Sequence, residues 1–215
     1  MIIGLTGGIA TGKSTVSRLL QKRGFPVIDA DQVARDVVRP GEEALAEIVR
    51  VFGEDMLKED GTLDRKRLGV RIFEDDEARK TLEAILHPRI RARMLEAIQK
   101  IETISPYPVI VDVPLLFETG WDRLTDANIV VFAPPDVQKK RLMARDQLSE
   151  KEAYERIQAQ WPLEEKVKRA DWVLDNSGDE NALAREVERL IEHWHAAGFI
   201  HDKEKNGTCS GREKG

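Results

Sequence analysis

Glycines, a lysine and hydroxyl side chains near the start of the chain could together hold a phosphate group. The stretch GLTGGIATGKST covers residues 4–15 and follows Gly7 and Gly12 with Lys13 and Ser14. Glycines let backbone N–H groups curl around a phosphate, and the N-terminus of a following helix adds a positive dipole end. The lysine supplies charge, and the serine hydroxyl can bind Mg²⁺. The pattern predicts a phosphate-binding loop for ATP or GTP.

The residues around this loop are the ones such a loop needs. An apolar run at 2–6 precedes it, and Val16, Leu19 and Leu20 follow at helical spacing, so it lies between a strand and a helix. This context disfavours the alternative of a glycine-rich turn with a solvated lysine. Lys13 is expected at the β- and γ-phosphates and Ser14 on Mg²⁺. The predicted nucleotide-binding residues of the loop are Gly8, Ala10, Thr11, Gly12, Lys13, Ser14 and Thr15.

Acidic residues follow two other apolar runs. Asp29 and Asp31 come after FPVID, and Asp112 lies within VIVDV. Ligands gather at the carboxyl ends of parallel strands, so these carboxylates should arrive beside the loop. We expect Asp31 to orient or deprotonate an attacking hydroxyl and Asp112 to help organise magnesium. Asp29 fits a helix cap as well as it fits a functional role, and both interpretations stay open.

Two further charged residues follow these carboxylates in the chain. Arg35 lies four positions after Asp31, so it could pair with that carboxylate on one helix face or hold a substrate phosphate. Both interpretations stay open. Glu118 is expected to be a loop charge with no chemical task.

The apolar pattern supplies the elements that must position these side chains. Helical patterns alternate with short, non-alternating apolar runs bounded by Gly, Pro or acidic residues, which is typical of buried parallel strands. The runs are IIGLT (2–6), FPVID (25–29), VIVDV (109–113), NIVVF (128–132) and DWVLD (171–175).

The spacing of the strands predicts an inserted domain. The segment between Asp29 and Val109 has helical character only and is far longer than one crossover needs. A second helical excursion covers about 137–168, where Ser149 and Glu152 form a capping-box pattern. The predicted organisation is a core of 1–30 and 106–200 with a lid at about 137–168, an inserted helical domain at 31–105 and a disordered tail at 201–215.

Composition limits the classes of partner. The chain has 215 residues, 41% hydrophobic content and a formal net charge of −5, so no overall basic field favours nucleic acid or a membrane surface. The single cysteine, Cys209, excludes a disulfide framework. No signal peptide is visible, and no apolar run approaches the about 20 residues of a membrane helix. We expect a cytoplasmic protein that is a monomer or a weak homo-oligomer.

Beyond these patterns, the chain resembles the dephospho-CoA kinase family. The resemblance covers residues 1 to about 198 and rests on seven stretches in order: GLTGGIATGKST, VIDADQVAR, GTLDRKRLGVRIF (61–73), ILHPRIR (85–91), VDVPLLFE (111–118), RLMARD (141–146) and ADWVLDNSG (170–178). It implies an α/β fold of the P-loop NTPase type, a parallel sheet flanked by helices, with an inserted helical acceptor-binding domain and a helical lid.

The resemblance also implies an activity: ATP-dependent phosphorylation of the ribose 3′-hydroxyl of dephospho-CoA, with Mg²⁺ as cofactor, giving CoA and ADP in the final step of CoA biosynthesis. Catalytic roles then fall to Asp31, Lys13 and the lid arginines Arg141 and Arg145. Acceptor binding falls to Asp31, Arg35, a turn at His87 and Pro88, and Leu115. Asn176 corresponds to a loop on the adenine side, and Ser14 and Asp112 to the metal site.

One departure from the family pattern concerns the loop. The family usually has GGIGSGKS where this chain has GGIATGKS, so Ala10 stands in place of a glycine. We therefore expect that position 10 does not need a positive φ.

The loop motif also occurs in proteins of two other functional classes. Another small-molecule kinase with the same loop would not account for the seven stretches. A guanine-nucleotide switch is formally suggested by Asp175-x-x-Gly178, but no N-K-x-D segment that would read guanine occurs in the chain.

Overall fold

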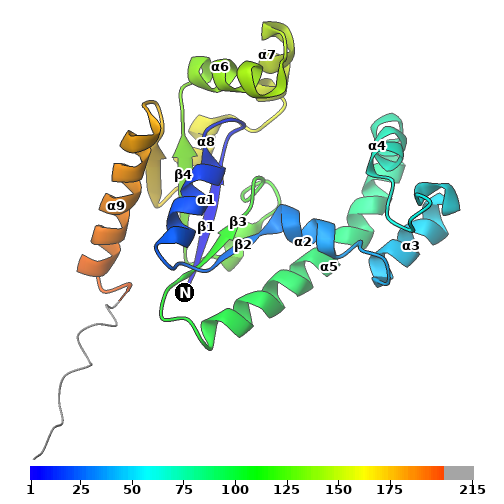
Figure 1. Ribbon diagram of the computed structural model, residues 1–215, viewed down its shortest axis with the longest axis horizontal. Helices are drawn as coiled ribbons and strands as arrows, with labels where there is room; N and C mark the ends of the chain where they lie inside the picture. Colours follow the sequence, from blue (N-terminus) through cyan, green and yellow to red (C-terminus); the bar gives the residue numbers. More distant parts are fainter. Residues whose placement is uncertain (201–215) are drawn as a thin grey trace, which may run out of the picture.

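The computed structural model describes residues 1–200 (Figure 1). The predicted disordered tail at 201–215 lies outside the described residues. Among the described helices, none has the length and apolar character needed to cross a membrane.

The centre of the molecule is a parallel sheet with strand order β2-β3-β1-β4-β5. All five predicted strands are present. Their bounds are β1 (Ile2–Gly7), β2 (Val27–Asp29), β3 (Val109–Asp112), β4 (Ala127–Phe132) and β5 (Trp172–Asp175). The central strands are buried on both faces, which explains their continuous apolar runs.

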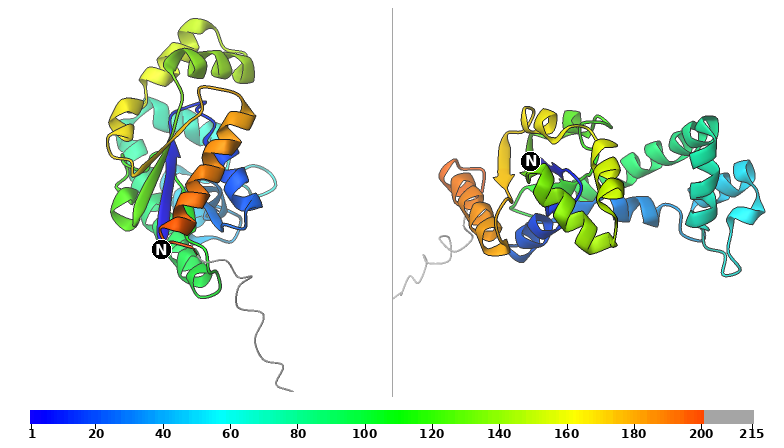
Figure 2. Two further views of the ribbon diagram at one scale, coloured as in Figure 1. Left: turned by 90° about the vertical axis from the view of Figure 1, so that its left-hand side faces the viewer. Right: turned by 90° about the horizontal axis from the view of Figure 1, so that it is seen from above.

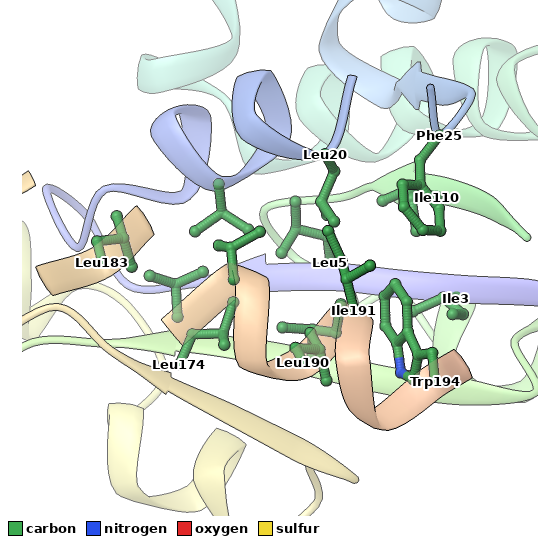
Figure 3. Packing of buried hydrophobic residues seen from close by; sticks show 14 of the residues in the cluster. Ile3, Leu5, Leu20, Phe25, Ile110, Leu174, Leu183, Leu190, Ile191 and Trp194 are labelled. Carbon is green, nitrogen blue, oxygen red and sulfur yellow. The ribbon is translucent and has the colours of Figure 1, made fainter. Parts of the chain in front are cut away.

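Helices cover both faces of the sheet. On one face α1 (Lys13–Lys22) and α9 (Glu180–Ala196) pack against β1 and β4, with Trp194 fully buried among them (Figure 3). On the other face Met94, Ile98 and Leu163 from the connecting helices contact β3 and β4. This two-layered burial fixes the carboxyl ends of the strands, where β1 leads into the phosphate loop.

The predicted insertion consists of helices with a core of their own. They are α2 (Ala30–Asp36), α3 (Glu43–Phe52), the 3₁₀ turn η1 (Glu54–Met56), α4 (Arg65–Glu74) and α5 (Asp76–Glu102). Figures 1 and 2 show α3 and α4 to one side of the sheet, with α5 running back to it. Ile85 of α5 packs with α3 and α4, whereas Met94 and Ile98 pack on the sheet. One long helix therefore joins the two cores.

The expected turn at His87 and Pro88 is wrong, because both residues lie inside α5. Proline at position 88 cannot donate a backbone hydrogen bond, yet the helix continues through it. The guanidinium of Arg89 donates to the carbonyl of Ile85 at 2.8 Å and to Glu47 of α3 at 2.6 Å. The Arg89 side chain thus ties α5 to α3 next to the proline.

Three helices follow β4 in the predicted lid segment: α6 (Pro135–Asp146), α7 (Glu150–Gln158) and α8 (Leu163–Val167). Helices α6 and α7 lie beyond the carboxyl end of the strand, whereas α8 packs on the sheet (Figure 1). The predicted capping box is confirmed: Ser149 accepts from the backbone of Glu152, and the Glu152 carboxylate accepts from the backbone of Ser149. A short 3₁₀ turn, η2 (Trp121–Leu124), precedes β4.

Candidate active site

The phosphate loop occupies the turn between β1 and α1. Helix α1 starts at Lys13 with Gly12 as its N-cap, and its first turn holds no acidic residue and no side-chain cap. The first N–H groups of a helix have no partner within it, so they can point at an anion. Thr11 braces the loop by donating from its hydroxyl to the carbonyl of Gly8 at 2.9 Å. The loop therefore has the form that phosphate binding requires.

Glycine is needed at position 12 for two reasons. Its φ of 92° lies in the left-handed region, and a Cβ there would lie 2.2 Å from the side-chain nitrogen of Asn176. That nitrogen donates to the carbonyl of Thr11 at 2.7 Å. The buried Asn176 amide thus holds the loop backbone, a contact that the predicted role on the adenine side did not include.

The expectation for Ala10 is wrong. Its φ is 59°, so this position takes the left-handed conformation although it carries a Cβ. Such a conformation costs an L-residue about 1–2 kcal/mol. The chain must turn sharply here to direct N–H groups inward, and the alanine adopts the strained conformation that glycine would adopt freely.

Lys13 forms an ion pair with Asp112, the last residue of β3. The carboxylate of Asp112 is buried, and burial raises its pKa against the lowering effect of Lys13 and of a hydrogen bond from Ser17. Asp29 lies opposite Asp112 in the strand register and raises the same pKa further. A cationic partner is what keeps a buried carboxylate at this site ionised. Lys13 of the phosphate loop and Asp112, the acidic residue predicted to help organise magnesium, are therefore in direct contact.

The two open interpretations of Asp29 are resolved in favour of the cap. Its carboxylate accepts from the backbone N–H groups of Asp31 at 2.8 Å and Gln32 at 3.2 Å, at the start of α2. Asp31 is the second residue of α2. Together with the phosphate loop it lines a cavity of about 330 Å³. Among the described residues, none donates to or pairs with the Asp31 carboxylate. The site thus has one carboxylate engaged in capping and one free for a ligand.

This site cavity combines the loop with residues from distant parts of the chain. Beyond the loop and Asp31, it is lined by Pro114, Arg145 and Gln160. Arg145 of α6 also pairs with its neighbour Asp146 at 2.8 Å. The structure therefore brings together one lid arginine, the free carboxylate and the phosphate loop.

The second lid arginine lies elsewhere. Arg141 lines a separate cavity of about 220 Å³ with Gly12, Thr15 and Asn176. It donates to the carbonyl of Gly178 at 3.0 Å, while its other terminal nitrogen, Nη1, is buried without a hydrogen-bond partner among the described residues. The two arginines thus line different cavities, and the expectation that they close over the ATP phosphates stays a prediction. Both cavities border the loop, since Gly12 lines each of them.

Of the residues predicted to bind the acceptor, only Asp31 lines the cavity of the phosphate loop. Arg35 lies on α2 one turn beyond Asp31 but lines a different cavity, and it forms no ion pair with that carboxylate. His87 is exposed on α5 and lines none of the cavities described. Leu115 is 44% exposed and follows Pro114, which does line the site.

Sequence reasoning missed Gln160, which lies between α7 and α8. Its side-chain oxygen accepts from the backbone N–H of Ile9 in the phosphate loop at 2.7 Å. A lone glutamine in a polar stretch carries no motif, so only the fold brings it to the loop.

Glu118 is also more than the expected loop charge. It lies 2.7 Å from the ammonium group of Lys166, a lysine of α8 that is fully buried. Lys166 also donates to the carbonyl of Pro114 at 3.1 Å, and Thr6 of β1 donates to the same carbonyl at 2.9 Å. A buried ion pair thus fixes the base of the lid to the segment that lines the site.

Comparison with known proteins agrees with this arrangement. The sequence profile of the dephospho-CoA kinase family matches residues 1–182. A dephospho-CoA kinase of Anaeromyxobacter dehalogenans is 52% identical over 88% of this chain and 90% of its own length. A dephospho-CoA kinase of Geobacillus kaustophilus is 46% identical over 91% of this chain and 98% of its own length.

Solved structures agree as well. The crystal structure of TT1252 from Thermus thermophilus has a TM-score of 0.76 and 39% identity, covering 90% of this chain and 97% of that one. The structure of dephospho-CoA kinase from Campylobacter jejuni has a TM-score of 0.72 and 33% identity, covering 92% of this chain and 98% of that one. These likenesses confirm the predicted P-loop α/β fold. With a profile match over most of its length and relatives of this similarity, the chain belongs to the dephospho-CoA kinase family.

Proposed function

We propose that this protein uses ATP to phosphorylate the ribose 3′-hydroxyl of dephospho-CoA, giving CoA and ADP as the final step of CoA biosynthesis. Family membership supports the substrates. The observation that carries the chemistry is the shared cavity, in which the phosphate loop, Arg145 and the unpaired Asp31 carboxylate meet. Transfer of a phosphoryl group to a hydroxyl needs these three elements and little covalent chemistry from the protein.

The roles of the residues follow from their positions. The loop N–H groups, Lys13 and Arg145 would bind the phosphates and oppose the charge that develops during in-line transfer. Asp31 would accept a hydrogen bond from the attacking hydroxyl and take its proton as the new bond forms. Lys13 would exchange part of its contact with Asp112 for the nucleotide phosphates.

The donor set fits a magnesium ion. Ser14 supplies a hydroxyl and Asp112 a carboxylate, which are hard oxygen ligands. Pairing with Lys13 lowers the pKa of Asp112 against the raising effect of burial and so favours the ionised form that binds a cation. We infer that these two residues would hold Mg²⁺, directly or through water. The ion would neutralise charge on the β- and γ-phosphates when bound.

Arg141 is proposed to serve the nucleotide from the other side of the loop. Its unsatisfied buried nitrogen and the neighbouring Thr15 and Asn176 form a polar pocket next to the loop. A buried donor without a partner is costly, so a ligand oxygen, nitrogen or aromatic face would satisfy it. We therefore assign this pocket to the nucleoside part or α-phosphate of ATP.

The domain division remains a proposal with the same boundaries: a core of 1–30 and 106–200, a lid at about 137–168 and an acceptor-binding insertion at 31–105. Closure of lid and insertion would exclude water, which otherwise competes as acceptor. The cytoplasmic location and the monomeric or weakly oligomeric state stay predictions, as does the absence of nucleic-acid and membrane partners.

The test is a panel of acceptors with Mg²⁺-ATP, comparing dephospho-CoA, adenosine and AMP by release of ADP. The proposal expects the highest kcat/KM with dephospho-CoA. A higher kcat/KM with AMP would identify a nucleoside monophosphate kinase instead. Repeating the panel with GTP would decide the choice of nucleotide.

A further inference from the structure

The side chain of Gln160 has one end engaged and one end without a partner. Its Oε1 atom accepts from the backbone N–H of Ile9 in the phosphate loop at 2.7 Å. Since an N–H group needs an acceptor, this contact fixes which end of the carboxamide is the oxygen. Within residues 1–200, no acceptor receives a hydrogen bond from the Nε2 group. Gln160 is half-buried and lines the cavity of the phosphate loop, so a ligand there can reach this donor.

The backbone around Gln160 is held on both sides. The N–H of Gln160 itself donates to the carbonyl of Ile157 at 3.2 Å, at the end of α7. The next residue, Trp161, has its ring centroid 4.8 Å from the guanidinium of Arg169, and Pro162 then serves as the N-cap of α8. A donor on a fixed segment loses less conformational entropy when it binds a ligand. The side-chain amide is therefore preorganised at the cavity.

The two cations that line the same cavity are already partnered. Lys13 pairs with Asp112, and the Nε and Nη2 atoms of Arg145 donate to Asp146 at 2.8 Å and 3.1 Å. A phosphate must compete with these carboxylates for the cations. The Nε2 group of Gln160 has no such competitor among the described residues, so it can bind a phosphate oxygen without giving up a contact.

We propose that the Nε2 group of Gln160 donates to a peripheral oxygen of the γ-phosphate of ATP and keeps this contact during transfer. This proposal rests on the proposed function. The transferred phosphate must lie between the phosphate loop and Asp31, and the cavity that Gln160 lines is the one that both share. Fixed donors aimed at the transferred group stabilise the charge that spreads over its oxygens in the transition state. Gln160 is thereby a further catalytic residue.

The test begins with Gln160→Glu, which keeps an oxygen for the N–H of Ile9 but has no N–H to donate. We expect kcat to fall about 10- to 100-fold, which corresponds to the loss of one hydrogen bond to a charged group. The dissociation constant of ATP, measured by calorimetry, should rise more than that of ADP, because only ATP carries the γ-phosphate. The melting temperature should stay near wild type, since the contact with the loop is kept.

Gln160→Met shows whether the added charge of glutamate alone causes the loss. Methionine has a similar length and carries neither an N–H donor nor a charge, so kcat should fall to a similar extent. Methionine also leaves the N–H of Ile9 without its acceptor, so the dissociation constant of ADP should rise as well. The two variants together separate the donor at Nε2 from the acceptor at Oε1.

Gln158→Glu is the matched control. Gln158 is the last residue of α7, is exposed, and lines neither of the two cavities that border the phosphate loop. The same change of charge, two positions before Gln160, should leave kcat and both dissociation constants unchanged. Circular dichroism would establish that all three variants are folded.

Three outcomes would overturn the proposal. A wild-type kcat in Gln160→Glu would mean that Gln160 only braces the loop through its oxygen. A wild-type kcat in Gln160→Met would assign the loss in the glutamate variant to charge repulsion, and an equal loss in Gln158→Glu would assign it to general electrostatics. Failure of the proposed function is a separate result: wild type would then form no CoA, while the dissociation constants of ATP and ADP would still report the γ-phosphate contact.

Discussion

At the scale of single residues, the division of work between Asp29 and Asp31 decides the chemistry. Both are acidic and both follow β2, but Asp29 is committed to two backbone N–H groups and Asp31 is not. The two hydrogen bonds hold the Asp29 carboxylate at the start of α2, which fixes its position as a cap. Asp31 lines the cavity of the phosphate loop, and its role toward a substrate hydroxyl is our proposal.

Replacing Asp31 with asparagine should affect turnover and little else. Asparagine keeps the size of the side chain but cannot take a proton, so we expect kcat to fall about 10²- to 10⁴-fold. The dissociation constant of ATP and the melting temperature should stay near wild type, since Asp29 is the cap. A large rise in the ATP dissociation constant with kcat preserved would show that Asp31 organises the nucleotide instead.

Gly12 tests the structural basis of the loop. Gly12→Ala places a methyl group against the Asn176 amide at a φ of 92°, so it should disturb the loop and strongly weaken ATP binding. Gly120→Ala is the matched control, since Gly120 has a φ of 71° and open space around it. Both variants share a conformational cost of about 1 kcal/mol, to be checked by denaturant unfolding. ATP binding that is equally intact in both would contradict the account of the loop.

At the scale of elements, residues of the predicted lid contact the phosphate loop and the segment that follows β3. Gln160 accepts from the phosphate loop, and Lys166 of α8 contacts Glu118 and the Pro114 carbonyl. Lys166 and the carboxylate oxygens of Glu118 are buried, and a buried ion pair is costly to break on one side only. The base of the lid and the loop after β3 should therefore behave as one unit.

Lys166→Met should destabilise the protein, because it leaves the Glu118 carboxylate poorly solvated and without its cation. The expected loss in the free energy of unfolding is on the order of 3 kcal/mol. Adding Glu118→Gln removes the orphaned charge and should restore part of that loss. Urea unfolding of the two variants measures both quantities; a Lys166→Met protein as stable as wild type would show that the pair is not coupled.

The elements themselves were largely predictable from the sequence, and the site was predictable in part. Strands buried on both faces give continuous apolar runs, and the loop motif carries its own context. The helix through Pro88 was not predicted, because a proline usually interrupts a helix, yet α5 runs through it. Gln160 and Lys166 reach the site only through the fold, and no local pattern marks them. The positive φ of Ala10 was not predicted, because alanine by itself prefers a negative φ and only the path of the loop imposes the left-handed conformation.

At the scale of the whole molecule, two helical units meet a sheet that carries the phosphate loop. The insertion has its own core and is joined to the sheet through α5, while α2 leads directly from β2 into it (Figure 1). Asp31 sits at the start of that connection, next to the loop. A substrate held by the insertion would thus present its hydroxyl where the sheet presents the nucleotide.

The central claim is that the γ-phosphate of ATP moves to the 3′-oxygen of dephospho-CoA. The most direct measurement is to incubate the protein with Mg²⁺-ATP and dephospho-CoA and identify the product by mass spectrometry and ³¹P NMR. The account predicts CoA carrying a 3′-phosphomonoester, formed in a one-to-one ratio with ADP, and no such product from the Asp31→Asn protein on the same time scale. Release of ADP and inorganic phosphate without CoA, or a phosphate at another position, would contradict it.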